Sequence, residues 1–300
     1  MNKKVVVFGS LNRDYYFELL RFPNKGETVF SNITGIDFGG KGLNQLFACS
    51  LLGAKHCFIG TIGDDDAGFA LQVFFKNNNI THILNKTKDL YTGTAYIFVE
   101  KETGENSIIV NSGANYSKEV SFDKIFFNLG DIASSVFEVP QHLIIRFFSK
   151  AKSQGAKTVL NPSPSLQIDP LLKELVDVFI VNETELMSLF EVYNIKTEKS
   201  ETAISFLQKK GFPQKDVAIV LTLGDKGALL YDKGNCYEFS SQKTNVVDTT
   251  GAGDCFSGAL CTALSRGCDL QTAVKFAVKM AGMTVQYPGT TSSYQKAFGK

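Results

Sequence analysis

An apolar run passes directly into a helical pattern in the stretch VFIVNETELMSLFEV, residues 178–192. The run Val178–Val181 has the length and composition of a strand buried on both faces, and one residue, Asn182, separates it from the helical pattern. Similar short β-branched or aromatic runs alternate with helical patterns along most of the chain. This alternation is typical of βαβ units, so the sequence predicts an α/β fold with a mostly parallel central sheet.

The same patterns place the other elements and one region that interrupts them. Strands are predicted at residues 5–8, 56–59, 94–100, 107–111, 124–129, 158–161, 178–181, 218–223 and 228–232. Helices are predicted at residues 42–52, 69–77, 140–154, 183–192, 200–210, 253–266 and 270–287. Residues 12–38 and 91–113 have strand character without an intervening helix, and the second stretch is typical of a β-hairpin. No linker or repeat divides the chain, so we expect a single domain, 1–300, with a β lid built from about 12–38 and 91–113.

Composition and charge exclude several classes of protein. The chain has 300 residues, 44% of them hydrophobic, and its 31 basic and 30 acidic side chains leave a net charge of +1. This balance provides no basic surface for nucleic acid or for an anionic membrane. Six cysteines without a C-x-x-C pair and only three histidines argue against a zinc site or a disulfide framework. No apolar run is long enough for a signal peptide or a membrane span, so we expect a cytoplasmic protein with reduced thiols.

The strongest chemical signal is a glycine-rich loop that opens a helix, DTTGAGDCFSGA at residues 248–259. Backbone N–H groups at a helix start have no partner within the helix and attract anions, and glycines let a phosphate approach closely. Asp254 lies at the same opening, where its carboxylate could accept a proton from a hydroxyl aimed at the phosphate. The simpler alternative is that Thr250 or Asp254 only caps the helix.

A second glycine-rich loop, FGGKGLNQ at residues 38–45, also opens a helix. It differs from a Walker A loop because Gly42 stands where a magnesium-binding Ser or Thr is needed. With Lys41 and Asn44 near its mouth, the loop is better interpreted as a polar substrate loop. An ordinary strand–turn–helix corner is the alternative.

Asn12 and Asp14 follow the first predicted strand, at the edge of the sheet where ligands of α/β proteins gather. They alternate in an extended segment, so their side chains share one face. A carboxylate and an amide together can hold the vicinal hydroxyls of a polyol. The alternative interpretation is a solvated loop.

Two further segments are weaker signals. Asn182 and Glu185 lie where a strand meets a helix, and an acidic first turn stabilises a helix without any ligand. The functional alternative gives Glu185 a place near magnesium and its water, and Asn182 a phosphate contact. The stretch LTLGDKGA at residues 221–228 is by itself only a turn between strands.

Taken together and in this order, the segments resemble the ribokinase-like, phosphofructokinase-B type family of carbohydrate kinases. The loops at 39–44 and 248–254 are highly specific as a pair, and the resemblance covers nearly the whole chain. It implies a three-layer α/β/α sandwich with a small β-sheet lid. It also implies transfer of the γ-phosphate of ATP to the primary hydroxyl of a small sugar, with D-ribose and its 5-phosphate as the leading pair, and a homodimer formed through the lid.

The resemblance also assigns roles to residues. Asp254 is implied as the general base, and also contacts the sugar, while the anion hole is implied to consist of the N–H groups of Gly251, Ala252 and Gly253. The other residues implied to hold the sugar are Asn12, Asp14, Gly40, Lys41, Asn44 and Glu138. The residues implied to hold ATP are Asn182, Thr222, Gly224, Gly227 and Gly253, with Glu185 ordering Mg²⁺ through water. The residues implied to bind an activating monovalent cation, K⁺ first, are Asp248, Thr250, Thr284, Tyr287, Gly289 and Ser293.

The chain departs from the family pattern in two places and leaves alternatives open. Val278 occupies the adenine-side position that is often Asn or His, and residues 290–294 read TTSSY where Ala-Gln-Pro-Ser is usual. A fructokinase, deoxyribokinase or nucleoside kinase is the nearest alternative, and a non-catalytic sugar-binding regulator is a remote one. A dinucleotide-dependent oxidoreductase is excluded because no G-x-G-x-x-G follows the first strand.

Overall fold

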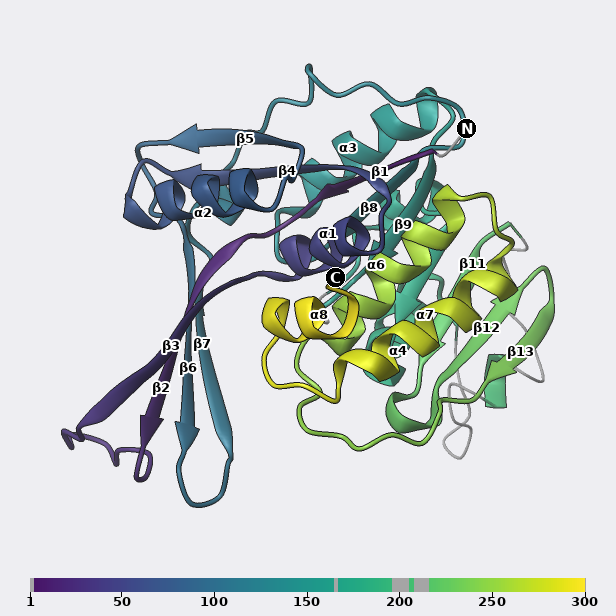
Figure 1. The fold of residues 1–300 in the computed structure, drawn as a ribbon. Coiled ribbons are helices and arrows are strands. Elements are labelled where there is room, and N and C mark those ends of the chain that lie inside the picture. Colours follow the sequence, from purple (N-terminus) through teal and green to yellow (C-terminus); the bar gives the residue numbers. More distant parts are fainter. Residues whose placement is uncertain (1–2, 165–166, 196–204, 208–215, 300) are drawn as a thin grey trace.

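The computed structural model describes residues 3–164, 167–195, 205–207 and 216–299, and its strands form two sheets (Figure 1). The larger sheet has the order β13-β12-β11-β10-β9-β8-β1-β4-β5. Its strands are β1 (Lys4–Phe8), β4 (Lys55–Gly63), β5 (His82–Thr87), β8 (Ile132–Val136), β9 (Lys157–Asn161), β10 (Val178–Val181), β11 (Ala218–Thr222), β12 (Ala228–Asp232) and β13 (Asn235–Phe239). Only the pairs β11–β12 and β12–β13 are antiparallel in this sheet. The predicted α/β fold with a mostly parallel sheet is confirmed.

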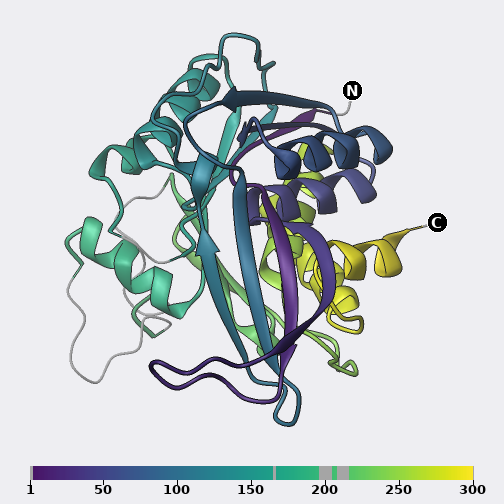
Figure 2. The ribbon, with the colours of Figure 1, turned by 90° about the vertical axis from the view of Figure 1, so that its left-hand side faces the viewer.

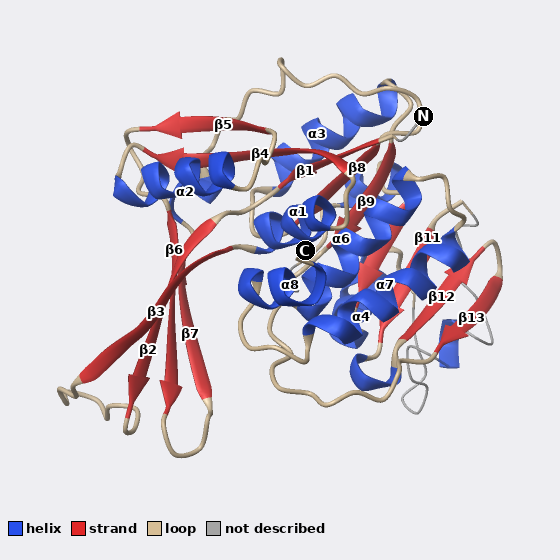
Figure 3. Ribbon diagram, viewed as in Figure 1, coloured by secondary structure: helices blue, strands red, loops and turns tan. Residues whose placement is uncertain are grey.

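Helices cover both faces of the larger sheet, which gives three layers (Figure 3). One face packs against α3 (Gln141–Ser153) and α4 (Glu183–Val192). The helices on the other face are α1 (Lys41–Leu51), α2 (Asp66–Asn77), α6 (Ala252–Ser265), α7 (Leu270–Thr284) and α8 (Thr291–Phe298). Strand β1 serves both cores, because Val6 and Phe8 face the first layer whereas Val5 and Val7 face the second. None of the described helices has the length and apolar character that crossing a membrane requires.

The smaller sheet extends away from the main body (Figures 1 and 2). Its order is β3-β2-β6-β7, and its strands are β2 (Asn12–Leu19), β3 (Ser31–Gly39), β6 (Gly93–Glu100) and β7 (Asn106–Asn111). Stacked rings stiffen one face: Tyr15 lies on Tyr96 and Phe17 on Phe98, with centroids 5.6 and 5.2 Å apart. The expected small sheet is present, and its action as a lid stays a prediction.

The predicted strand at 124–129 is wrong, because that segment is irregular. Ile125 and Phe127 are buried while Phe126 and Leu129 are exposed, so the alternation of a strand is there, but none of the described strands pairs with it. The segment instead covers α3, where the Phe127 ring contacts Phe147. The short strands β5 and β13 were not predicted, since their polar residues weaken the pattern. Most of the helix predicted at 200–210 lies outside the described residues.

Candidate functional site

The site lies at the carboxyl ends of the parallel strands, where two loops interlock. The loop after β1 passes so close to the start of α1 that a Cβ on Gly42 would lie 2.7 Å from Gly9 Cα and 2.7 Å from Ser10 N. Glycine at position 42 is therefore required by backbone contact. This contact joins the two loops that the sequence marked as candidates for polar binding.

Glu138, which follows β8, fastens these loops together. Its Oε2 accepts hydrogen bonds from the Ser10 hydroxyl at 2.5 Å and from the Lys41 backbone N–H at 2.9 Å. Burial raises the pKa of Glu138, although both hydrogen bonds oppose the shift. Ser10 was not among the predicted site residues, yet it lies two residues after the end of β1, where a hydroxyl at the carboxyl end of a strand is a usable signal.

Three predicted sugar ligands present acceptor oxygens beside these loops. The Asn12 Oδ1 accepts from the Asn115 amide at 2.8 Å. Asp14 Oδ1 and Asn44 Oδ1 are buried and have no hydrogen-bond partner among the described residues. A buried acceptor without a partner is costly, so these two oxygens fit a ligand that supplies hydroxyl donors. Asn115 was missed as a site residue because its part is to orient Asn12.

The charges around this cluster perturb one another. Burial, followed by the neighbouring carboxylates of Asp37 and Glu138, raises the pKa of Asp14 to about 7. Asp37 is paired directly with Asp14 across β2 and β3. The carboxylates of Asp254, Glu138 and Glu185 outweigh burial and raise the pKa of Lys41. A protonated lysine therefore offsets part of the negative charge at the loop mouth.

Asp254 lies in the first turn of α6 and faces the sugar loop. It is 5% exposed, and its Oδ2 accepts from the Asn44 amide at 3.0 Å. The Ala252 N–H donates to the Thr249 carbonyl at 3.1 Å, whereas the described residues offer no backbone acceptor to the N–H groups of Gly251, Gly253 and Asp254. Two of the three predicted anion-hole donors are therefore free, and Asp254 adds one that was not predicted.

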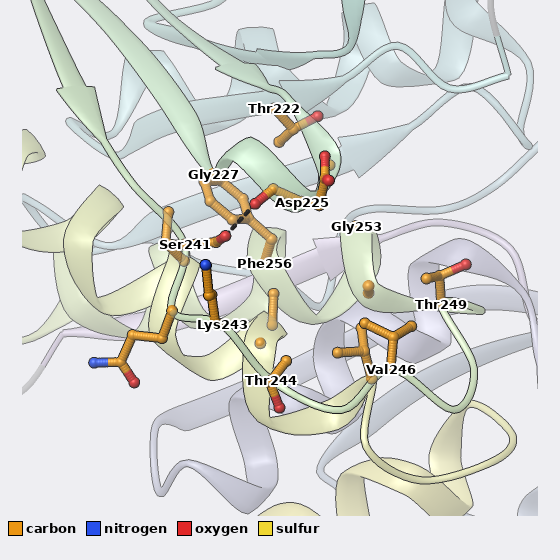
Figure 4. A pocket seen from close by; sticks show the side chains of 17 residues that line it. Thr222, Asp225, Gly227, Ser241, Lys243, Thr244, Val246, Thr249, Gly253 and Phe256 are labelled. Carbon is orange, nitrogen blue, oxygen red and sulfur yellow. Dashed lines mark hydrogen bonds between the residues drawn. The ribbon is translucent and has the colours of Figure 1, made fainter.

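The same turn borders a cavity of about 710 Å³, which Thr249, Ala252 and Gly253 help to line (Figure 4). The predicted nucleotide residues in its lining are Thr222, Gly224, Gly227 and Gly253. Its apolar wall includes Val246, Phe256 and Val278, together with Ala281 and Gly282. Val278 thus belongs to an apolar slot, which suits the faces of a purine ring better than its hydrogen-bonding edge.

Asn182 and Glu185 do not line this cavity. They form a capping box at the start of α4, in which the Asn182 side chain accepts from Glu185 N at 2.9 Å and Glu185 Oε2 accepts from Asn182 N at 3.0 Å. Glu185 therefore stabilises the start of the helix without a ligand, as the alternative for this acidic first turn expected. Glu185 is only 4% exposed, and the hydrogen bonds of the described residues leave its Oε1 free.

The predicted cation residues come from segments that hydrogen bonds hold side by side. Asp248 accepts from the Thr250 N–H at 2.8 Å and from the Gly289 N–H at 2.9 Å. The Ser293 hydroxyl donates to the Thr290 carbonyl at 2.8 Å in the same region. No group of three or more His, Cys, Asp or Glu side chains able to hold a metal occurs in the described part of the chain. Asp248 is the one carboxylate among the predicted cation residues, so the other oxygens that they offer are carbonyl and hydroxyl oxygens.

Comparison with known proteins agrees with this geometry. Residues 2–297 match the sequence model of the pfkB family carbohydrate kinases. A ribokinase of Staphylococcus aureus is 35% identical, over 98% of this chain and 97% of the relative. A ribokinase of Haemophilus influenzae is 34% identical, over 98% and 95%. A solved structure of Arabidopsis thaliana ribokinase, complexed with ribose and ATP, has a TM-score of 0.83 at 29% identity and 100% coverage of both chains. These matches span both the polar loops and the residues that line the cavity.

Proposed function

This chain belongs to the pfkB family of carbohydrate kinases, and we propose on that premise that it phosphorylates a small sugar with ATP. D-ribose is the leading substrate, and D-ribose 5-phosphate is its product. The observation that carries the proposal is the position of Asp254, which lies between the unpaired acceptors of the sugar loops and the free N–H groups at the start of α6. Relatives of 34–35% identity that are ribokinases support ribose as the sugar.

The chemistry needs little beyond positioning and charge. Asp254 accepts the proton of the sugar's primary hydroxyl as that oxygen attacks the γ-phosphorus, and ADP leaves from the opposite side. The free N–H groups of Gly251, Gly253 and Asp254 bind the charge that develops on the transferred group. Glu185 would order a bound Mg²⁺ through water, since this ion keeps several of its waters, and the ion would neutralise charge on the phosphates.

The unpaired acceptors Asp14 Oδ1 and Asn44 Oδ1 support a polyol as substrate. Which polyol is the substrate is a question for experiment. A site that hydrogen-bonds each hydroxyl rejects an analogue lacking one by about 10⁴-fold, so a fructokinase, deoxyribokinase or nucleoside kinase is the alternative. The test is ADP release from Mg-ATP with ribose, 2-deoxyribose, fructose, tagatose and several nucleosides, each in K⁺ and in Na⁺. Turnover on ribose that K⁺ stimulates supports both the substrate and the cation site. Turnover on another sugar or nucleoside would keep the kinase activity and change the assigned substrate. No turnover on any compound of the panel would contradict the proposal.

ATP binding in the apolar slot can be tested with a larger side chain that occupies the slot. Gly282 lines the cavity, and a Cβ at that position would meet nothing within 4 Å, so Gly282→Leu is accommodated by the fold. We expect the KM for ATP to rise by about tenfold or more, because the leucine occupies space that the adenine would bury. The KM for the sugar stays unchanged. The matched control is Lys279→Leu on the exposed side of α7, and an equal effect of the two variants would contradict this binding site.

We also propose that two copies of the chain associate through the smaller sheet. Its exposed apolar side chains are Ile33, Ile36, Ile108, Ile109 and Val110, each more than half exposed. They lie on the two edge strands, β3 and β7, and exposed apolar side chains on the edge strands of a sheet are typical of a protein interface. Sedimentation is expected to give a dimer, and Ile109→Glu to give a monomer, whereas Asn106→Glu on the same strand leaves the dimer intact. A wild-type monomer at micromolar concentration contradicts the proposal.

A further inference from the structure

Tyr294 is the largest fully buried side chain that makes a hydrogen bond at the edge of the site. Its hydroxyl donates to the carbonyl of Gly251, the residue that caps the start of α6. Burial, followed by the nearby Asp254 carboxylate, raises the pKa of Tyr294 well above its ordinary value, so the hydroxyl keeps its proton and remains a donor. This contact belongs to the TTSSY segment, in which the chain departs from the family pattern.

The Gly251 carbonyl determines how the turn before α6 is oriented. It accepts from Cys255 N at 2.8 Å as well as from Tyr294. Because a peptide group is planar, fixing this carbonyl also fixes the Ala252 N–H, which donates to Thr249 O at 3.1 Å. The free N–H groups and the Asp254 carboxylate sit on this same turn. The direction in which they point therefore depends on the hydrogen bond from Tyr294.

Position 251 requires glycine for this hydrogen bond to form. Its φ of 76° lies in the left-handed region, and a Cβ would stand 2.8 Å from the Tyr294 hydroxyl and would also collide with the Thr290 methyl. The start of α8 is thus packed tightly against the start of α6. A small rotation of α8 cannot be absorbed at this contact without moving the turn.

The same first turn of α8 is bonded to the smaller sheet. The Thr291 hydroxyl donates to Asp37 Oδ1 at 2.8 Å, and Asp37 is the cross-strand partner of Asp14. The hydrogen bond from Thr291 thus ties Asp37, the cross-strand partner of Asp14, to the first turn of α8, and Tyr294 in that same turn bonds to Gly251. We propose that Tyr294 is a positioning residue for phosphoryl transfer, and that the first turn of α8 couples the smaller sheet to the anion-hole turn. The inference rests on the proposed kinase activity.

The test is a double-variant cycle measured on the full chain with its best sugar. Tyr294→Phe keeps the ring and deletes the hydroxyl, and it is expected to lower kcat by about tenfold while leaving both KM values within about twofold. Thr291→Val is expected to raise the KM for the sugar and to lower kcat by about threefold. Because Thr291 acts on catalysis through Tyr294, the kcat of the double variant should equal that of Tyr294→Phe alone.

Matched controls separate positioning from general packing. Tyr193→Phe deletes another hydroxyl that donates to a backbone carbonyl, that of Lys173 at 3.4 Å, at the end of α4. Thr34→Val deletes a hydroxyl of the smaller sheet that bonds to Tyr16 O at 3.4 Å and not to α8. Both should retain wild-type kinetics, and thermal unfolding should show that every variant is folded.

Four outcomes would overturn the inference or one of its two parts. The positioning role fails if Tyr294→Phe keeps wild-type kcat, or if Tyr193→Phe loses as much. The coupling fails if the kcat losses of Tyr294→Phe and Thr291→Val multiply in the double variant. In both cases an active wild-type protein leaves the proposed function standing. A wild-type protein inactive on every sugar would remove the proposed function and this inference with it.

Discussion

Asp254→Asn is expected to lower kcat by about 10²–10⁴-fold, because a general base contributes that much to proton transfer. The asparagine has nearly the same shape, and its side-chain oxygen can still accept from the Asn44 amide, as Asp254 Oδ2 does at 3.0 Å. The N–H groups at the start of α6 are also unchanged. We therefore expect the dissociation constants of the sugar and of ATP, measured by calorimetry, to change by less than about threefold.

Asp89→Asn provides the control, since Asp89 is exposed and its carboxylate makes none of the hydrogen bonds described for the site. It should keep wild-type kcat and binding. A kcat for Asp254→Asn within tenfold of wild type would show that Asp254 is not the base. A large loss of sugar affinity with little loss of kcat would give Asp254 a binding role in place of the catalytic one.

Site residues that belong to a local motif, with a recognisable residue type and spacing, were predictable from the sequence. Asp254 with its glycines, and Asn44 in the loop at 39–44, were identified from local patterns, and the fold brings both to one hydrogen bond. The alternation of strands and helices likewise predicted the α/β fold, because buried parallel strands need continuous apolar runs. The sequence placed Gly42 in a glycine-rich loop, but it did not predict the close contact of Gly42 with Gly9.

Residues that act through a distant partner were not predictable. Asn115 is 103 positions from the Asn12 side chain that it orients, and Tyr294 is 43 positions from the Gly251 carbonyl that it bonds. Nothing in the neighbourhood of either residue indicates the partner, because tertiary packing alone brings them together. The same reason explains the strand wrongly expected at 124–129: an alternating pattern reports which side chains are buried, and not whether a neighbouring strand exists.

The pH dependence of sugar capture is expected to report the ionisation of Asp14. Its pKa of about 7, raised by burial and by Asp37 and Glu138, means that the carboxyl of the free enzyme gains its proton as the pH falls through about 7. A protonated carboxyl loses part of its capacity to accept from sugar hydroxyls. We therefore expect kcat/KM for the sugar to level off above pH 8 and to fall about tenfold per pH unit well below 7. The hydroxyl donors of a bound sugar favour the ionised carboxylate of Asp14. The acidic limb of the profile, which is the fall below pH 7, should therefore be absent from kcat at saturating sugar.

Asp14→Asn tests whether the limb belongs to this residue. The variant cannot ionise at position 14, so its kcat/KM should lose the limb near pH 7. At pH 8 its kcat/KM should be lower by about 10²–10⁴-fold, because two hydrogen bonds to a charged acceptor contribute about 1.5–3 kcal/mol each. The neighbouring carboxyls of Asp37 and Glu138 also have raised pKa values, both through burial, and are the competing sources of such a limb. A limb that survives in Asp14→Asn would belong to one of them, and Asp14 would then be excluded as the group whose ionisation limits sugar binding.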